Sequence, residues 1–470
     1  MNSIKYIFSG LLLILLFNSC SPVKENKAEK ATDVISAITA STTETGKPID
    51  KVYCNNSSIN SYALYLPKNY SKDKRWPVIF FFDPHASGKL PVKRYDTLAE
   101  KYGYVICCSN NSKNGLDIAS IKNVSAEMMN DVFQNFFIDS NRVYAGGFSG
   151  GARVAATLAM SNNITGLICC GAGIQADMTF VNPQINYIGI AGKADFNYVE
   201  LSFTDEQLAA ANKLKHQLVV FDGKHEWPPL SIMEQAFLWL ELDAMRNNLI
   251  KKDLALIETV SKQLKEECEK TVKEKNIYEQ FNAYSKAVNY LNGLSDVSWF
   301  SSRKEQLKGF ASLNQIIKQR KEQFVKEFNL QQKYMAAIPD KDLNWWQREV
   351  STMKILADQN KEEAYTYKRL LNYLSLGAYM YSNDALSKNN LKMAETFLTL
   401  YELVDPFNSE HAYMRAVTAA EAGNQKEVFS FLEKTIQLGF NDRERLDADA
   451  AFSNIRNEEK FQKLADKIND

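Results

Sequence analysis

The sequence predicts an α/β protein in which a doubly wound, mostly parallel sheet is followed by an all-helical region. In the first half of the chain, short continuous apolar runs alternate with helix-like segments, as expected for strands that helices cover on both faces. A Gly-Phe-Ser-Gly-Gly corner joins one of these runs to an alanine-rich segment. Of 11 prolines only Pro339 and Pro406 lie beyond Pro229, so helices are expected almost throughout the second half.

Length and composition limit the number of domains and the classes of partner and cofactor. A chain of 470 residues is too long for one hydrophobic core and predicts two or three domains. Basic and acidic residues both number 56, so the formal net charge is zero and nothing indicates a nucleic-acid partner. The cysteines show no spacing typical of a disulfide framework or a zinc site, and neither a metal nor another cofactor is expected.

The N-terminus is typical of an exported protein. Lys5 precedes the apolar run 6–17, which is too short to cross a bilayer and has the layout of a secretion signal. The following Asn-Ser-Cys resembles the lipobox of bacterial lipoproteins, which implies removal of residues 1–19 and acylation of Cys20. Plain secretion is the alternative. Residues 20–49, rich in Lys, Glu, Ser and Thr, are interpreted as a flexible tether.

The expected location is therefore the cell envelope, with the protein held on a membrane by its N-terminal lipid. Ser21 rather than aspartate follows Cys20, which favours the outer membrane.

A first folded region is expected at 50–247. Short apolar runs predict strands and are joined by segments that predict helices. The strands are expected at 62–66, 77–82, 104–108, 142–148, 166–170, 186–191 and 216–221, and the helices at about 92–102, 125–137 and 150–160. In a parallel sheet the chemistry belongs in the loops at the carboxyl ends of the strands.

The corner at 147–151 has the pattern of a nucleophile elbow. A serine in a tight strand-to-helix turn is forced towards positive φ, so its neighbours must lack side chains where strand and helix crowd together. Gly147 and Gly151 supply those bare positions on either side of Ser149. The serine hydroxyl would lie at a helix N-terminus, where backbone N–H groups can stabilise a developing oxyanion.

An acid and a base follow in order. Asp195 comes after the sixth predicted strand and His225 after the seventh, which completes a Ser-Asp-His order expected of a hydrolase triad. In this hypothesis Ser149 is the nucleophile, His225 takes its proton and Asp195 orients the imidazole. Asp177, after the fifth predicted strand, is the reserve candidate for the acid.

From about residue 62 to 242 the sequence resembles the carboxylesterase branch of the α/β-hydrolase superfamily, which includes feruloyl and acetylxylan esterases and poly(3-hydroxybutyrate) depolymerase-like enzymes. The resemblance rests on 98–105, on 138–144 leading into the elbow, and on 223–228, Gly-Lys-His-Glu-Trp-Pro. It implies an α/β-hydrolase fold and cleavage of a small or polymeric ester, acylated carbohydrate being one class. Trp227 and Tyr198 are interpreted as packing residues or, alternatively, as the lining of an acyl or sugar pocket.

The loop after the second predicted strand departs from the family pattern. Where such enzymes usually carry His-Gly, this chain reads Asp-Pro-His-Ala-Ser-Gly over 83–88. Pro84 has no N–H to donate. The oxyanion donors are therefore expected to be the backbone N–H of Gly150 and that of His85 or Ala86.

The second half is expected to contain degenerate helical repeats or a connector at 248–375 and tetratricopeptide-like repeats at 376–470. The resemblance to tetratricopeptide repeats rests on Ala394, Leu398, Tyr401 and Pro406, with a second unit one period later. Such arrays usually present a concave surface to a peptide or partner protein. A purely structural appendage is the alternative.

Together these patterns predict a lipid-anchored serine carboxylesterase of the cell envelope. A serine peptidase on the same fold is a second hypothesis. A third, motivated by the Asp83-Pro84 substitution, is a binding or scaffold protein whose hydrolase-like domain has lost activity.

Overall fold

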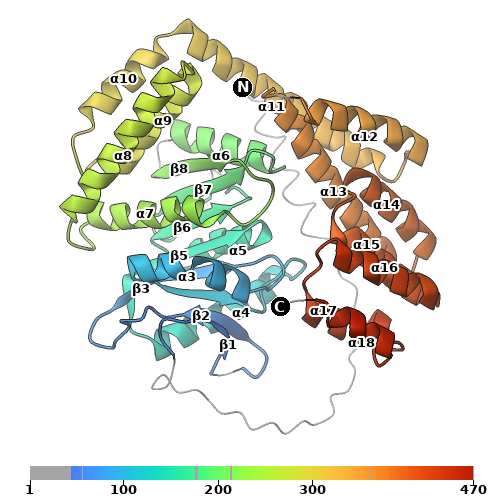
Figure 1. The fold of residues 1–470 in the computed structure, drawn as a ribbon. Coiled ribbons are helices and arrows are strands. Elements are labelled where there is room, and N and C mark those ends of the chain that lie inside the picture. Colours follow the sequence, from blue (N-terminus) through green and yellow to red (C-terminus); the bar gives the residue numbers. More distant parts are fainter. Residues whose placement is uncertain (1–43, 56, 175–177, 212–213, 360, 469–470) are drawn as a thin grey trace. The chain divides into compact units, whose positions relative to one another are not determined.

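The structure is a computed structural model that describes residues 44–55, 57–174, 178–211, 214–359 and 361–468 (Figure 1). The chain divides into two compact units, one ending at Phe324 and the other running Val325–Asp470. The predicted fold class, a doubly wound and mostly parallel sheet followed by an all-helical region, is confirmed.

Four sequence predictions fall wholly or mostly outside the described residues: the signal at 1–19, the lipidation site Cys20, the tether at 20–49 and the reserve acid Asp177. They stay predictions. No helix in the described part of the chain combines the length and apolar character needed to cross a membrane.

Eight strands form one sheet in the order β1-β2-β4-β3-β5-β6-β7-β8. β1 pairs antiparallel with β2, and β2 antiparallel with β4, whereas all pairs from β4 through to β8 are parallel. β1 lies at the edge and is largely exposed, which explains why its polar sequence gave no strand signal. The strands are β1 Ile49–Tyr53, β2 Ser61–Tyr65, β3 Trp76–Phe82, β4 Val105–Ser109, β5 Ile138–Phe148, β6 Gly166–Cys170, β7 Asn186–Gly192 and β8 His216–Phe221.

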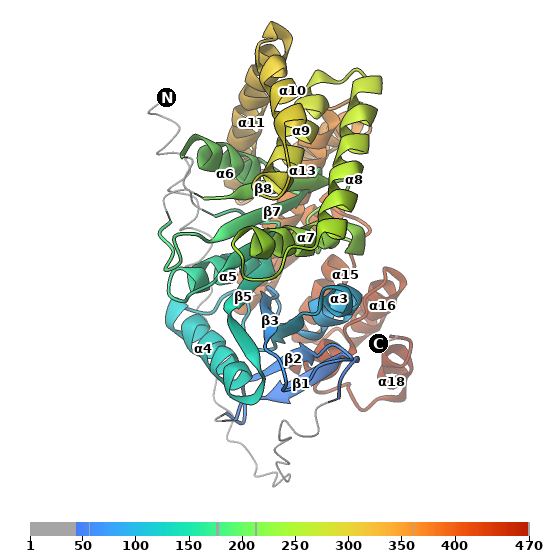
Figure 2. The ribbon, with the colours of Figure 1, turned by 90° about the vertical axis from the view of Figure 1, so that its left-hand side faces the viewer.

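Helices cover both faces of this sheet, which is why β3 and β6 are buried along their whole length and carry no charged residue. Figure 2 shows α4, α5 and α6 on one side and α3 and α7 on the other. Successive strand residues alternate between the two cores, so the neighbours Cys107 and Cys108 belong to opposite faces. The helices are α3 Lys89–Tyr102, α4 Ile118–Asn135, α5 Gly150–Ala159, α6 Tyr198–Ala211 and α7 Leu230–Arg246.

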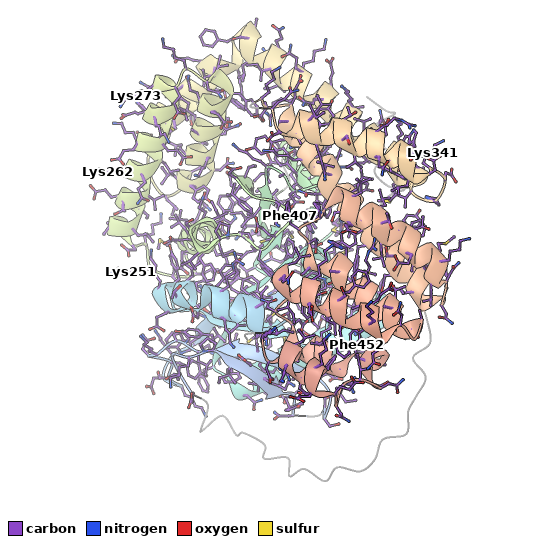
Figure 3. The ribbon with its side chains drawn as sticks, turned by 45° about the vertical axis from the view of Figure 1, so that its right-hand side comes forward. Lys251, Lys262, Lys273, Lys341, Phe407 and Phe452 are labelled. Atoms are coloured by element: carbon purple, nitrogen blue, oxygen red, sulfur yellow. The ribbon has the colours of Figure 1, made fainter. Side chains whose placement is uncertain are left out.

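The first unit continues past the sheet. Buried residues of α8 (Leu254–Lys273), α9 (Ile277–Leu291) and α10 (Ser298–Lys308) join the same hydrophobic core as α3 and α7. α8 buries one face only, and Lys262 and Lys273 mark its charged, exposed side (Figure 3).

The second unit is entirely helical in its described residues. It begins within α11 (Ala311–Ala337), and its helices pack on their neighbours in sequence. Ala394, Leu398 and Tyr401 are buried in its core, as is Phe452, whereas Phe407 in the turn after α14 is 82% exposed (Figure 3). The remaining elements are α12 Leu343–Ala357, α13 Ala364–Ser387, α14 Leu391–Val404, α15 Ser409–Glu421, α16 Gln425–Gln437, α17 Arg443–Ala448, the 3-10 helix η1 Ala450–Phe452 and α18 Glu459–Ala465.

The six cysteines of the described chain are all buried and unpaired. Burial raises the pKa of each thiol because it disfavours the thiolate. For Cys54 and for Cys268 the pKa rises to about 12. These thiols act as small apolar core groups.

Candidate active site

The turn from β5 into α5 has the geometry of a nucleophile elbow. Ser149 adopts φ 51° and ψ −119°, a strained conformation, and its N–H donates to the carbonyl oxygen of Cys170 on the neighbouring strand at 2.8 Å. A Cβ atom at Gly147 would lie 2.3 Å from the carbonyl carbon of Gly151, and one at Gly151 would lie 2.0 Å from the carbonyl oxygen of Phe82. Both glycines are therefore required by the close approach of strand and helix.

The structure brings Ser149, His225 and Asp195 together, although they are far apart in sequence. Nε2 of His225 lies 2.9 Å from Oγ of Ser149, and Nδ1 lies 2.9 Å from Oδ1 of Asp195. Asp195 is 1% exposed. The imidazole thus lies between a hydroxyl and a buried carboxylate, which is the arrangement that lets it accept a proton from the serine.

Backbone pairing beyond the sheet aligns the acid with the base. After β7 and β8 end, the N–H of Lys193 donates to Phe221 at 2.8 Å and the N–H of Ala194 donates to Gly223 at 2.9 Å. These bonds extend the pairing of the two strands into their loops. The loops that carry Asp195 and His225 are thereby held side by side.

Asn197 supports the acid directly. Its backbone N–H donates to Oδ1 of Asp195 at 2.8 Å, and its side-chain amide donates to the carbonyl oxygen of Gly171 at 2.8 Å. Gly171 adopts φ +62°, and a Cβ there would lie 3.1 Å from both Oδ2 of Asp195 and Cε1 of His225. The loop after β6 therefore closes tightly over the acid and the imidazole.

Two phenyl rings flank the imidazole. The ring centroids of Phe148 and Phe196 lie 4.6 Å and 4.1 Å from that of His225. These two rings pack against the imidazole from neighbouring segments and help to hold it in place.

The loop after β3 uses its backbone donors internally. The N–H of His85 donates to Oδ1 of Asp83 at 2.8 Å, and the N–H of Ala86, which has φ 59°, donates to the carbonyl oxygen of Asp83 at 3.2 Å. Of the predicted oxyanion donors, these two already have acceptors. Gly150 is the first residue of α5, so its N–H has no acceptor within the helix.

Trp227 joins this loop to the histidine loop. Its indole N–H donates to Oδ2 of Asp83 at 2.8 Å, and both side chains are buried. The indole ring packs against Phe81, Tyr95 and Phe148. The structure thus places Trp227 in the hydrophobic core of the first unit.

Replacing Trp227 with phenylalanine is expected to lower the free energy of unfolding by about 1–3 kcal/mol, because Oδ2 of the buried Asp83 loses its donor. The matched control is Trp239→Phe in the same core, since the indole N–H of Trp239 has no acceptor among the described residues. Urea unfolding of both variants measures the difference. Equal losses in the two variants would mean that the hydrogen bond contributes nothing.

Tyr198, the other pocket candidate, also packs inside. It is 9% exposed, its ring meets that of Phe324 edge-on with centroids 5.6 Å apart, and its hydroxyl accepts a hydrogen bond from Arg320 at 2.9 Å. Its place is between α6 and α11, within the first unit.

The described residues contain no group of three or more His, Cys, Asp or Glu side chains that could hold a metal ion.

Sequence reasoning missed several residues that shape the site. The Asp-Phe-Asn run at 195–197 carries the Asx-turn signal for Asn197, because an aspartate side chain often accepts from the N–H two residues on. The contacts made by Gly171 and by Phe196 leave no comparable local pattern.

No family model and no curated protein matches the sequence. Among solved structures, the chain is similar to FphF, a fluorophosphonate-binding serine hydrolase of Staphylococcus aureus, at 15% identity and TM-score 0.34, covering 42% of this chain and 99% of that one. It is similar to the S-formylglutathione hydrolase FrmB of the same organism at 14% identity and TM-score 0.34, covering 42% and 98%. It is also similar to the esterase Est2 of Thermogutta terrifontis at 12% identity and TM-score 0.33, covering 45% and 95%.

Proposed function

We propose that this protein is a serine hydrolase that cleaves carboxylic esters through an acyl-enzyme intermediate. One observation carries the proposal: the hydroxyl of Ser149 and the carboxylate of Asp195 each lie 2.9 Å from a different nitrogen of the His225 ring. The strained backbone of Ser149 supports it, since such strain is kept where function requires it.

In the first half-reaction, Oγ of Ser149 attacks the ester carbonyl carbon while Nε2 of His225 takes the hydroxyl proton. The carbonyl oxygen becomes an oxyanion, which the N–H of Gly150 stabilises. As the oxyanion collapses, the bond from carbon to the alcohol oxygen breaks, and the imidazolium gives its proton to the departing alkoxide. Asp195 accepts a hydrogen bond from Nδ1–H throughout and stabilises the charged ring.

In the second half-reaction, a water molecule attacks the acyl carbon and gives a proton to Nε2 of His225. The new oxyanion collapses with cleavage of the bond to Oγ of Ser149, which regains the proton from the imidazolium. The free acid leaves. No redox partner or cofactor is needed for either step.

A fluorophosphonate probe tests the proposal. Wild-type protein is expected to carry one phosphonyl group, and peptide mapping should place it on Ser149. A panel of p-nitrophenyl esters and matched anilides then separates ester from amide cleavage. Preferred turnover of the anilides would favour the peptidase hypothesis, and well-folded protein that is not labelled would favour the inactive scaffold.

A further inference from the structure

We propose that Asn114 is a further catalytic residue, which donates a hydrogen bond from its side-chain amide to the oxyanion. The inference rests on the proposed ester hydrolysis and names a donor for it. It is prompted by the loop after β3, whose N–H groups at His85 and Ala86 are already bonded to Asp83. An oxyanion site is built from several preorganised donors, so Gly150 needs a second one from elsewhere.

The loop that carries Asn114 follows β4 and is held across the loop after β3. The backbone N–H of Asn114 donates to the carbonyl oxygen of Pro84 at 2.8 Å. The preceding residue, Lys113, forms an antiparallel bridge with His85. The backbone of Asn114 is therefore positioned by the loop after β3, in which the sequence places the expected oxyanion donors His85 and Ala86.

The side chain of Asn114 lies against the first residue of α5. A Cβ atom at Gly150 would lie 1.8 Å from Oδ1 of Asn114 and 3.3 Å from its Nδ2. In an α-helix the Cα–Cβ bond tilts towards the N-terminus, the end to which the free N–H groups also point. The amide of Asn114 thus lies at the end of α5 where the N–H of Gly150 would meet the oxyanion.

This contact also gives a reason for the glycine after the nucleophile. Any side chain at position 150 would occupy the place of the Asn114 amide. Gly150 differs in this from Gly147 and Gly151, where a Cβ atom would meet backbone atoms instead.

The amide is free to donate. Asn114 is exposed, and among the described residues its side chain makes no hydrogen bond. Rotation by 180° about Cβ–Cγ exchanges Oδ1 and Nδ2 and breaks no existing bond. In the free protein the partial negative charge of Oδ1 is favoured beside a helix N-terminus. Once the substrate oxygen takes on negative charge beside the N-terminus of α5, the amide orientation that points Nδ2–H₂ at this oxygen becomes the favourable one.

Replacing Asn114 with alanine is expected to lower kcat/KM for a p-nitrophenyl ester by about 10²–10³-fold, mostly in kcat. Asn114→Asp is expected to lose more, because it removes the donor and adds a negative charge beside the oxyanion. Lys113→Ala is the matched control on the same exposed loop and should retain the wild-type rate. Because Asn114 is exposed, all three variants should keep the wild-type melting temperature.

A trifluoromethyl ketone separates a catalytic role from a structural one, because its adduct with the serine carries an oxyanion. Its inhibition constant should rise across the Asn114 variants by the factor by which kcat/KM falls. Unchanged hydrolysis or unchanged inhibition in Asn114→Ala would overturn this inference alone, provided that the wild-type protein is active. A wild type that neither turns over esters nor reacts with a fluorophosphonate would instead overturn the proposed function, and this inference with it.

Discussion

The Ser149→Ala variant is expected to lose about 10⁶-fold in kcat for p-nitrophenyl ester hydrolysis, because no other group can form the acyl-enzyme. The fold should be unaffected for two reasons. Alanine adopts the positive φ of position 149 at the same cost as serine, and among the described residues the lost hydroxyl bonds only to His225. Stopped-flow and steady-state assays with matched circular-dichroism spectra measure both effects.

Two comparison variants test whether the three residues act as a unit. Asp195→Ala is expected to lose about 10⁴-fold, and the Ser149→Ala/Asp195→Ala double variant should be no slower than Ser149→Ala alone. Asp195→Asn can still accept from Asn197 and His225 through Oδ1 but carries no charge, so its rate should lie between those of wild type and Asp195→Ala. Residual turnover by Ser149→Ala near the wild-type rate would rule out the proposed mechanism.

The Glu241→Ala variant is expected to lower the free energy of unfolding by about 3–5 kcal/mol, because it leaves a buried guanidinium without its carboxylate. Glu241 on α7 forms an ion pair with Arg142 on β5, with side-chain exposures of 11% and 9%. The hydroxyl of Tyr104 donates to Glu241 at 2.6 Å and accepts from Arg142 at 3.0 Å.

Urea unfolding measures this loss, and the double variant Arg142→Met/Glu241→Leu is its control. Replacing both charges with apolar groups should restore most or all of the stability, because neither desolvated charge remains. If Glu241→Ala lowered the free energy of unfolding by less than about 1 kcal/mol, the Arg142–Glu241 pair would contribute no more than an exposed ion pair does.

Much of the sheet could be predicted because its strands are covered on both faces. The runs at 77–82 and 104–108, for example, are apolar on every residue and correspond to β3 and β4. α4 begins at Ile118, earlier than the predicted start near 125. Asp117 caps this helix by accepting a hydrogen bond from the N–H of Ser120. That cap was a signal that the apolar periodicity alone did not reveal.

The three residues at the centre of the site could be located in the sequence because each follows a strand in a fixed order. The residues that surround these three could not be predicted. The bond from Trp227 to Asp83 joins residues 144 positions apart, and the contact of Asn114 with Gly150 depends on how two loops fold over one another. Such contacts arise from the tertiary arrangement and leave no periodic or local pattern in the sequence.

The buried cysteines have a consequence for how this protein is made. The six thiols of the described chain are unpaired and buried within the cores. Folding of this part of the chain therefore needs no oxidant to form a disulfide and no disulfide isomerase. These thiols are exposed only in the unfolded chain, where an oxidant can pair them wrongly, so refolding after urea should give a higher yield with a reductant present than in oxidising buffer.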